Sequence, residues 1–234
     1  MADKTVTRAT PAEAFKRARR MWLKGERIHL APLADELGIG RATLFRWVGN
    51  KDLLIGEILW SLYEPLWRQA MAETPGNGVD YIVGVYRRTN SAILHFEPLR
   101  RFINQDPEYA LKILTSSQSI LHTRTVETNT RMLKDQVAAG HIKPPMNIFS
   151  LSYFMIRLAE SCLYSDIIAG REPREAELED ACTAVRILLG GKPWGLQALG
   201  AGPEARVSFL PGKTTRFAQT FFPGRKDTPT PWPI

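Results

Sequence analysis

The sequence has no long hydrophobic run, no leader-like apolar core near its N-terminus and only two cysteines. Apolar segments such as 92–94 and 187–189 are far shorter than the roughly 20 residues that a membrane helix needs. Residues 1–20 lack the apolar core of a secretory signal. Cys162 and Cys182 are too few for a disulfide framework, so we expect both to be reduced packing residues. These absences predict a cytoplasmic protein without membrane contact.

The chain also lacks the short motifs of common enzyme classes. It contains no Gly-x-Ser-x-Gly elbow, no His-Glu-x-x-His zinc motif and no dinucleotide-binding glycine loop. Gly212-Lys213-Thr214 resembles part of a phosphate loop, but Val207 stands where that loop needs its first glycine. The four histidines do not share the close spacing of metal ligands. We therefore expect no catalytic residue, no cofactor and no metal ion.

Composition and charge point to a soluble globule with a basic head. The 234 residues are 44% hydrophobic and 24% charged, with a net charge of +7. Residues 1–52 hold 11 basic and 6 acidic side chains, whereas residues 53–190 hold 14 basic and 16 acidic ones. Phosphate binding depends on counterion release by lysine and arginine, so a basic segment favours nucleic acid as a partner.

The spacing of apolar residues predicts an all-α fold. Thr10 to Glu13 combines a capping box with a proline at the first helical position, and the Asn77-Gly78 turn has no alternating strand beside it. Helices are expected over about 11–24, 30–37, 41–47, 51–66, 79–96, 98–104, 107–114, 116–139, 147–169 and 173–189. Three regions are expected: a helix-turn-helix domain over 1–55, a helical regulatory and dimerisation domain over 56–190, and a Pro/Gly-rich tail over 191–234.

The segment from Leu33 to Leu54 is the most informative part of the chain. It predicts two short helices joined by a tight turn at Gly38, followed by the start of a third helix. A glycine at this turn tolerates the left-handed backbone that closes a helix. A helix, a sharp turn and a second helix form the scaffold that places one helix in a DNA major groove.

Residues 10–55 resemble the DNA-binding domain of TetR-family transcriptional regulators. The family pattern is matched without a gap by Leu33-Ala34, Leu37-Gly38-Ile39-Gly40, Ala42-Thr43-Leu44-Phe45, Trp47-Val48, Asn50-Lys51-Asp52 and Leu54. The resemblance covers about the first quarter of the chain, and the rest agrees in its helical architecture. It implies a ligand-responsive regulator, most often a repressor, that binds a double-stranded DNA operator as a dimer and responds to a small-molecule effector.

Three departures from the family pattern affect the DNA-binding helix. Gly40 replaces the usual serine cap, which is a tolerable exchange. Phe45 replaces a tyrosine whose hydroxyl commonly reaches phosphate, so one backbone contact should be missing. Trp47 replaces the usual histidine, and its indole N–H can donate to phosphate or the ring can simply pack. The run from Phe45 to Lys51 resembles the QsdR-type branch of the family, which is associated with lactone degradation.

Side chains on helix 41–47 divide into a buried and an exposed set. Leu44 and Val48 are expected to turn inward, which leaves Arg41, Thr43 and Arg46 outward. Arginine can grip guanine O6 and N7 and a threonine methyl can touch thymine, although such residues can also position the duplex through phosphates alone. At a helix N-terminus, Lys51 is expected to meet phosphate. The expected DNA-binding residues are Arg41, Ala42, Thr43, Phe45, Arg46, Trp47 and Lys51.

The regulatory half contains aromatic and polar residues suited to a small-molecule pocket, which is mostly apolar with a few convergent polar groups. Aromatic residues at helical spacing also serve as ordinary core, so that alternative stays open. The expected effector-binding residues are Trp60, Trp67, Tyr86, Asn90, His95, Phe102, Tyr109, His122 and Phe154. The effector is expected to be small and apolar, and the lactone association of the QsdR-type branch makes a lactone one candidate.

The last two predicted helices, about 147–169 and 173–190, are expected to pair two chains into a homodimer. A stripe of Leu178, Ala181, Val185 and Leu188 and a small-residue face of Met155, Ala159, Cys162, Ser165 and Ala169 suit close helix contact, within or between chains. A helix-turn-helix protein usually reads two half-sites with two copies. The alternatives are a ligand-binding module with a non-functional DNA head and an enzyme.

Overall fold

The computed structural model describes residues 9–170 and 172–191, and all regular structure in these residues is α-helical. The helices are α1 (Pro11–Leu23), α2 (Leu30–Glu36), α3 (Arg41–Val48), α4 (Lys51–Glu73), α5 (Gly78–Leu94), α6 (Glu97–Gln105), α7 (Pro107–Thr115), α8 (Ile120–Ala138), α9 (Ile148–Leu163), α10 (Ser165–Ala169) and α11 (Glu175–Leu188). The all-α prediction is confirmed. The predicted tail lies outside the described residues, apart from Gly191.

The first three helices form a small domain whose ends follow from local sequence. The backbone N–H of Glu13 donates to the Thr10 hydroxyl and the N–H of Thr10 donates to the Glu13 carboxylate, so the predicted capping box begins α1. Gly38 has a φ of +65° at the turn between α2 and α3, and a Cβ there would meet no atom within 4 Å. Glycine is favoured at this turn because of its backbone conformation and not because of crowding.

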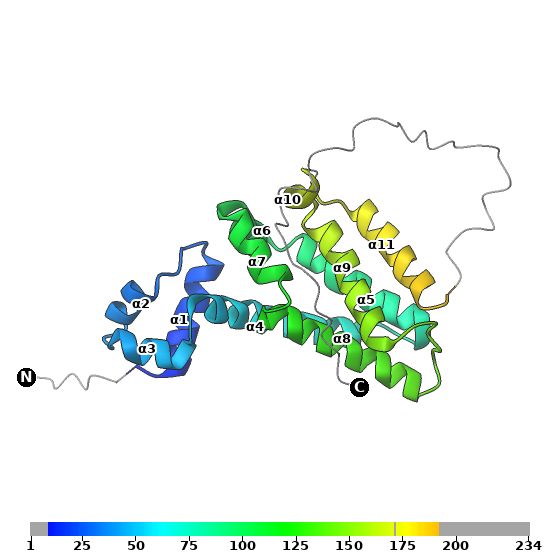
Figure 1. Cartoon of the computed structure of the whole chain (residues 1–234), viewed down its shortest axis with the longest axis horizontal. Helices are drawn as coiled ribbons and strands as arrows, with labels where there is room; N and C mark the ends of the chain where they lie inside the picture. The colour runs from blue at the N-terminus through cyan, green and yellow to red at the C-terminus, as the bar shows by residue number, and fades with distance from the viewer. Residues whose placement is uncertain (1–8, 171, 192–234) are drawn as a thin grey trace, which may run out of the picture. The chain divides into compact units, whose positions relative to one another are not determined.

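The long helix α4 connects the small domain of α1, α2 and α3, which we call the head, to the rest of the chain. Its N-cap Asn50 accepts a hydrogen bond of 2.8 Å from the N–H of Leu53, and the helix continues through Pro65 to Glu73. The domain boundary predicted at residue 55 falls inside this helix. Figure 1 shows α1, α2 and α3 grouped at the N-terminal end of α4, with α5 and α8 beside its later part.

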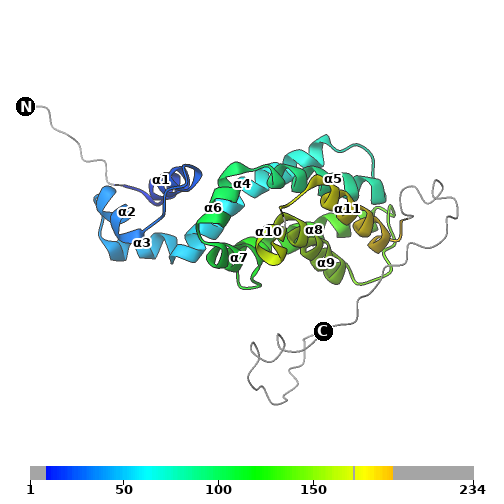
Figure 2. The same ribbon diagram turned by 90° about the horizontal axis from the view of Figure 1, so that it is seen from above.

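A bundle of α4, α5, α8, α9 and α11 forms the larger part of the described chain. We call this part the regulatory half, after the role predicted for it. Helix α11 packs on α5 and α9, and α9 packs on α8, as Figure 2 shows from above. The close approach of α4 to α8 depends on Gly56, where an added Cβ would lie 2.5 Å from Ile120 Cγ2. In the described part of the chain, no helix has the length and hydrophobicity needed to cross a bilayer.

Two predicted helices differ from the structure for local reasons. The helix expected to run unbroken to residue 169 is interrupted at Tyr164, between α9 and α10. The Arg100 guanidinium donates to the Leu163 carbonyl at 2.6 Å and lies 3.5 Å from the Asp166 carboxylate, so it replaces a helical partner of that carbonyl. Helix α8 begins later than expected because the Ser116 hydroxyl accepts from the N–H of Gln118 and favours a turn.

The two stripes considered for dimerisation face the interior of the same chain. Leu178, Ala181 and Val185 on α11 are at most 5% exposed, and the described small-residue positions on α9 and α10 are also buried. The free thiols of Cys162 and Cys182 are enclosed too, as expected for packing residues. Both stripes are therefore occupied by packing within one chain.

Candidate DNA-binding surface and ligand cavity

The predicted DNA-binding side chains gather on α3 and at the start of α4. Leu44 is fully buried and anchors α3 against α1 and α2, whereas Arg41, Ala42 and Arg46 are exposed. Phe45 is 48% exposed, which is high for a large apolar residue, while Thr43 and Trp47 are half-buried. The outward positions predicted for Arg41 and Arg46 are confirmed, whereas Thr43, also predicted outward, is half-buried. The exposed Phe45 ring lies on α3 as well.

The positive charge on the outward face of α3 is not neutralised by ion pairs within the described residues. Within residues 9–170 and 172–191, no carboxylate forms an ion pair with Arg41 or Arg46. Most other arginines of the described regions do have such partners; for example, Arg17 pairs with Glu36 on the neighbouring helix. Guanidinium groups without acidic partners keep their capacity to bind phosphate or guanine.

The first turn of α4 contacts α7 through a charged cluster. The Lys51 ammonium lies 4.6 Å from the centre of the Tyr109 ring, whose hydroxyl donates to the Asp52 carboxylate at 2.9 Å. Lys112 also binds that carboxylate at 2.8 Å. The hydrogen bond from Lys112, more than that from Tyr109, lowers the pKa of Asp52. The lysine expected to meet phosphate is therefore positioned by the regulatory half.

Helix α6 makes a second connection between the two halves. The Arg101 guanidinium donates to the Leu23 carbonyl at 2.9 Å, and the Gln105 amide donates to the Gly25 carbonyl at 2.8 Å. These carbonyls lie at the C-terminal end of α1, where helical partners are missing. The Trp22 ring of α1 also packs against Phe102, with centroids 5.7 Å apart. Helix α6 is therefore in direct contact with the C-terminal end of α1.

A polar cavity of about 70 Å³ lies inside the regulatory bundle. Its polar residues come mainly from α5 and α8. The hydroxyls of Tyr86 and Thr89 are buried and have no hydrogen-bond partner among the described residues. Tyr63, Tyr86 and Tyr164 line the cavity, and burial raises the pKa of each of their hydroxyls above its ordinary value. We call this the polar cavity; its lining comprises Tyr63, Trp67, Tyr86, Thr89, Asn90, Ile93, Leu114, Leu121, His122, Thr125, Asn129, Ile156, Ala159, Glu160, Leu163 and Tyr164.

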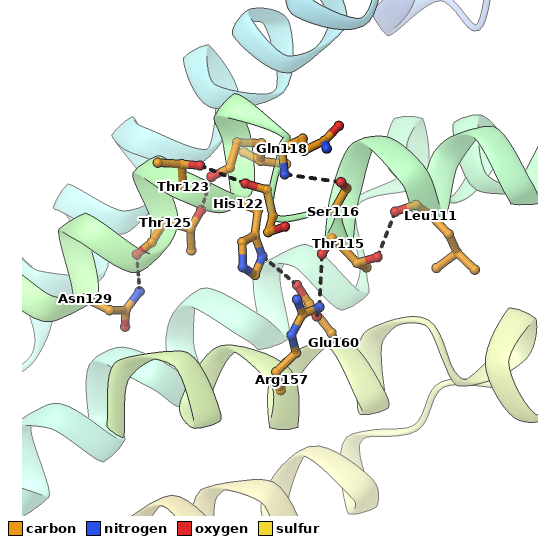
Figure 3. Close-up of polar contacts among 12 residues, drawn as sticks. Leu111, Thr115, Ser116, Gln118, His122, Thr123, Thr125, Asn129, Arg157 and Glu160 are labelled. Carbon is orange, nitrogen blue, oxygen red and sulfur yellow. Dashed lines mark hydrogen bonds and ion pairs between the residues drawn. The ribbon is translucent and has the colours of Figure 1, made fainter. Parts of the chain in front are cut away.

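A buried carboxylate lies in the wall of the polar cavity. Glu160 on α9 lies 3.2 Å from the Nδ1 atom of His122 on α8, and it accepts a hydrogen bond of 2.6 Å from Arg157 (Figure 3). The Arg157 guanidinium also donates to the Thr115 carbonyl. A buried carboxylate is tolerated only when it is paired, and here the arginine supplies the compensating charge.

A larger apolar cavity of about 260 Å³ adjoins the polar one. Phe96, the N-cap of α6, and Leu99 within α6 line it, so the helix that holds α1 also forms part of this wall. Ala92 is exposed, and together with Leu66 it also lines an open groove along α4 and α5. We call this the apolar cavity; its lining comprises Leu59, Leu62, Tyr63, Leu66, Ala92, Ile93, Phe96, Leu99, Leu114, Leu121 and Tyr164.

Of the nine predicted effector residues, four line one of these two cavities and five do not. Trp67, Tyr86, Asn90 and His122 line the polar cavity. The other five line neither cavity: Trp60 lies under the Arg124 guanidinium, His95 is exposed and bonded to Glu175, Phe102 and Tyr109 line a small cavity beside the head, and Phe154 is 47% exposed on α9. Their role in effector binding stays a prediction, and the cavities give it no support for these five.

Sequence reasoning missed several polar residues of the cavity wall, including Thr89, Thr125, Asn129 and Glu160. A signal was present, because Tyr86, Thr89, Asn90 and Ile93 recur at the spacing of one helical face. A polar pair on an otherwise apolar face marks a position where hydrogen-bonding groups are buried. In the described part of the chain, no group of three potential ligands is placed to hold a metal ion.

Comparisons with known proteins agree with this architecture. Residues 77–190 match the family model described as the tetracyclin repressor-like C-terminal domain. Among solved structures, the transcriptional repressor QsdR of R. erythropolis, from the TetR family, is 29% identical; the match covers 78% of this chain and 95% of that chain, with a TM-score of 0.70.

Two further solved structures match at lower similarity. The ketosteroid transcriptional regulator KstR2 of Mycobacterium tuberculosis is 16% identical over 78% of this chain and 94% of that chain, with a TM-score of 0.38. The TetR-family regulator PfmR of Thermus thermophilus is 19% identical over 76% of this chain and 97% of that chain, also with a TM-score of 0.38. No curated protein matches the chain.

Proposed function

We propose that this chain, which belongs to the TetR family of transcriptional regulators, is a repressor that a small effector releases from its operator. The observation that carries the proposal is the outward face of α3, where Arg41 and Arg46 stand exposed on a helix anchored by Leu44. A helix presented in this way fits the major groove of B-form DNA. The buried cavities of the regulatory half supply a separate place for the effector.

Each residue of the surface has a proposed role. Arg41 at the N-terminal end of α3 contacts guanine, because the first residues of a recognition helix reach the base edges. Arg46 in the last turn and Trp47 contact the phosphate backbone. Thr43 and the exposed Phe45 offer apolar contact to a thymine methyl group. Ala42 leaves room for the duplex to approach closely.

Replacing Lys51 by alanine tests the phosphate contact separately. We expect binding to weaken to a similar extent for every DNA sequence. The slope of log affinity against log salt should fall by about 2, because a dimer loses two phosphate contacts. Fluorescence anisotropy at several salt concentrations measures this slope. An exposed lysine on α8, Lys134, provides the control variant Lys134→Ala. An unchanged slope would remove Lys51 from the interface.

The dimer is proposed to form through the outward faces of α9 and α11. Six large hydrophobic side chains are exposed in the described regions, and four of them lie on α9, α10 and α11: Phe149, Phe154, Ile168 and Ile187. The two longer helices are direct neighbours, since the Cys162 thiol donates to the Glu177 carbonyl at 3.3 Å. A second copy of the chain covers this exposed apolar surface and brings two α3 helices to two half-sites.

The effector signal is proposed to reach the head through α6 and the first turn of α4. A ligand shifts a conformational equilibrium only if it binds the two states with different affinity. Phe96 and Leu99 form part of the cavity wall, while Arg101 and Gln105 of the same helix hold the end of α1. Filling the apolar cavity displaces α6, and the hydrogen bonds to the carbonyls of Leu23 and Gly25 carry that displacement to the DNA-binding head.

Removing these hydrogen bonds should separate effector binding from its effect. The double variant Arg101→Ala, Gln105→Ala is expected to keep operator affinity and effector affinity, but to lose about 0.5–2 kcal/mol of the coupling between them. The ratio of operator dissociation constants with and without effector measures this coupling. The control is Arg131→Ala, on the exposed side of α8. If the ratio is the same as in the native protein, α6 does not carry the signal.

The function itself is tested by selecting bound DNA from random duplexes with the full chain. We expect enrichment of an inverted repeat whose half-sites are about one helical turn, roughly 34 Å, apart or somewhat more. Adding lactones and other uncharged apolar molecules should release the enriched duplex. If no sequence is enriched while effectors still bind, the chain is a ligand-binding module with a non-functional head. If the effector instead strengthens DNA binding, the chain is a repressor that is activated by its effector and not released by it.

A further inference from the structure

The two cavities in the regulatory half are adjacent and differ in chemistry. They share five wall residues, Tyr63, Ile93, Leu114, Leu121 and Tyr164. The apolar cavity has aliphatic and aromatic residues in its wall, and its polar side-chain atoms come from the two shared tyrosines. The polar cavity adds threonine, asparagine, histidine and glutamate side chains. A single molecule that occupies both spaces has to be apolar at one end and polar at the other.

We infer that the effector is an uncharged amphipathic molecule, with a hydrogen-bonding head such as an amide, ester or alcohol in the polar cavity and a hydrocarbon chain in the apolar cavity. This inference rests on the proposed function, because it names the chemical class of the effector that the function requires. It also fixes the orientation of the molecule: its head lies toward α8 and α9, and its chain lies toward α6.

Two unpaired hydroxyls supply the evidence for a polar head. Thr89 is 1% exposed and Tyr86 is 4% exposed, and neither hydroxyl has a hydrogen-bond partner in the described protein. Leaving a buried polar group unpaired is costly, and each such group needs an explanation. Both residues line the same cavity, so one ligand group that accepts hydrogen bonds can satisfy the two hydroxyls together.

The charges around the polar cavity favour a neutral head. Glu160 already has its compensating cation, because Arg157 binds one carboxylate oxygen at 2.6 Å and His122 faces the other at 3.2 Å. A cationic ligand would find no free carboxylate in this wall. An anionic ligand would be buried next to Glu160 without a free cation of its own, and burying an unpaired charge is far more costly than burying an amide.

The dimensions suit a chain of several carbons. The apolar cavity holds about 260 Å³, whereas roughly 150 Å³ is enough to bind benzene in an engineered apolar cavity. The route from solvent is also apolar at its inner end: Leu66 and Ala92 line both the open groove between α4 and α5 and the apolar cavity. A molecule that enters there passes its head through the apolar cavity to the polar one.

The inference is tested first with a matched set of ten-carbon probes, without DNA. Calorimetric titration of the full chain with decanamide, 1-decanol, decanoate and decylammonium, each below its micellar concentration, compares four heads on one chain. Decanamide and 1-decanol should bind at least about tenfold more tightly than either ion. For hexanamide, octanamide and decanamide, the affinity should rise about fourfold per methylene until the cavity is full.

A second test uses the unpaired hydroxyl of Thr89. The variant Thr89→Val keeps the shape and removes the hydroxyl, so the ligand-free protein should melt about 2–4 °C higher while decanamide binds about tenfold more weakly. Thr130→Val is the matched control, because its hydroxyl is also buried and unpaired but lines neither cavity. That control should become more stable without any change in decanamide affinity.

The outcomes separate this inference from the proposed function. Decanoate or decylammonium binding as tightly as decanamide overturns the inference, and so does the failure of all four probes to bind. An unchanged decanamide affinity in Thr89→Val overturns the placement of the head. Uncharged probes that bind as expected, but leave the selected duplex bound, support the inference and contradict effector-controlled release.

Discussion

A Phe154→Glu variant is expected to lose operator binding by about two to four orders of magnitude, although it changes no residue of the DNA-binding surface. Phe154 is 47% exposed on α9, so the substitution does not disturb the core of the chain. In the proposed dimer the new carboxylate would be buried in an apolar contact without a partner, which is strongly unfavourable. Two separate heads then lose the effective concentration, worth about 10²–10⁴ in affinity, that a linked pair has.

Sedimentation and DNA binding measure the two parts of this prediction. The variant should sediment as a monomer at concentrations at which the native chain is a dimer, with an unchanged helical circular dichroism spectrum. Ile187→Glu on α11, where the side chain is 51% exposed, should behave in the same way. Ala72→Glu, on an exposed position of α4, is the control. A Phe154→Glu variant that remains dimeric would place the interface elsewhere.

Arg41→Ala is expected to cause the largest loss of any single change within the DNA-binding surface. A guanidinium that grips guanine is worth about 1–3 kcal/mol of discrimination, and a dimer uses the contact twice. The operator should therefore be bound roughly 30- to 10⁴-fold more weakly, while non-specific DNA should lose far less.

The comparison between specific and non-specific duplexes distinguishes a base contact from a phosphate contact. Loss of a phosphate contact weakens both duplexes equally and lowers the salt slope, as expected for Lys51→Ala. The control is Arg131→Ala, at an exposed position of α8 that no role in DNA binding requires. Equal weakening of both duplexes by Arg41→Ala would reassign Arg41 to the backbone, and an unchanged operator affinity would remove it from the interface.

The head was predictable because its structure is set by local sequence. The Thr10 capping box, the turn at Gly38 and the Asn50 cap each depend on residues within four positions, and all three occur as expected. The inward position of Leu44 follows from helical spacing alone. The same spacing determines which side chains of α3 are exposed, because they lie on the side of the helix opposite Leu44.

The regulatory half was less predictable because its features depend on contacts distant in sequence. The break at Tyr164 is associated with Arg100, 63 residues before Leu163, whose carbonyl accepts a hydrogen bond from the Arg100 guanidinium. Periodicity showed that α9 has distinct faces, but it could not tell which face meets the core. Phe154 was therefore expected among the effector residues, whereas it lies outward, and Thr89 was overlooked.

The walls of the two cavities were also only partly predictable from the sequence. His122 and Asn90 are predicted to line a pocket because small-molecule pockets need a few polar groups among apolar residues, and both line the polar cavity. Their partner Glu160 lies 38 positions after His122, on a different helix, and no local pattern connects the two. The chemistry of a cavity wall is a property of several helices together, so sequence spacing along one helix reveals only part of it.

Protection of a single introduced thiol by bound DNA would show directly that the exposed face of α3 meets the duplex. Ala42→Cys places a reactive thiol on the exposed face of α3, and Lys134→Cys places one on α8 as the control, while the native Cys162 and Cys182 are buried. Alkylation rates are measured with and without saturating operator duplex. Bound DNA is expected to slow alkylation at position 42 at least about tenfold and to leave the rate at position 134 unchanged. Equal rates at position 42 while the duplex is bound would contradict an interface formed by α3.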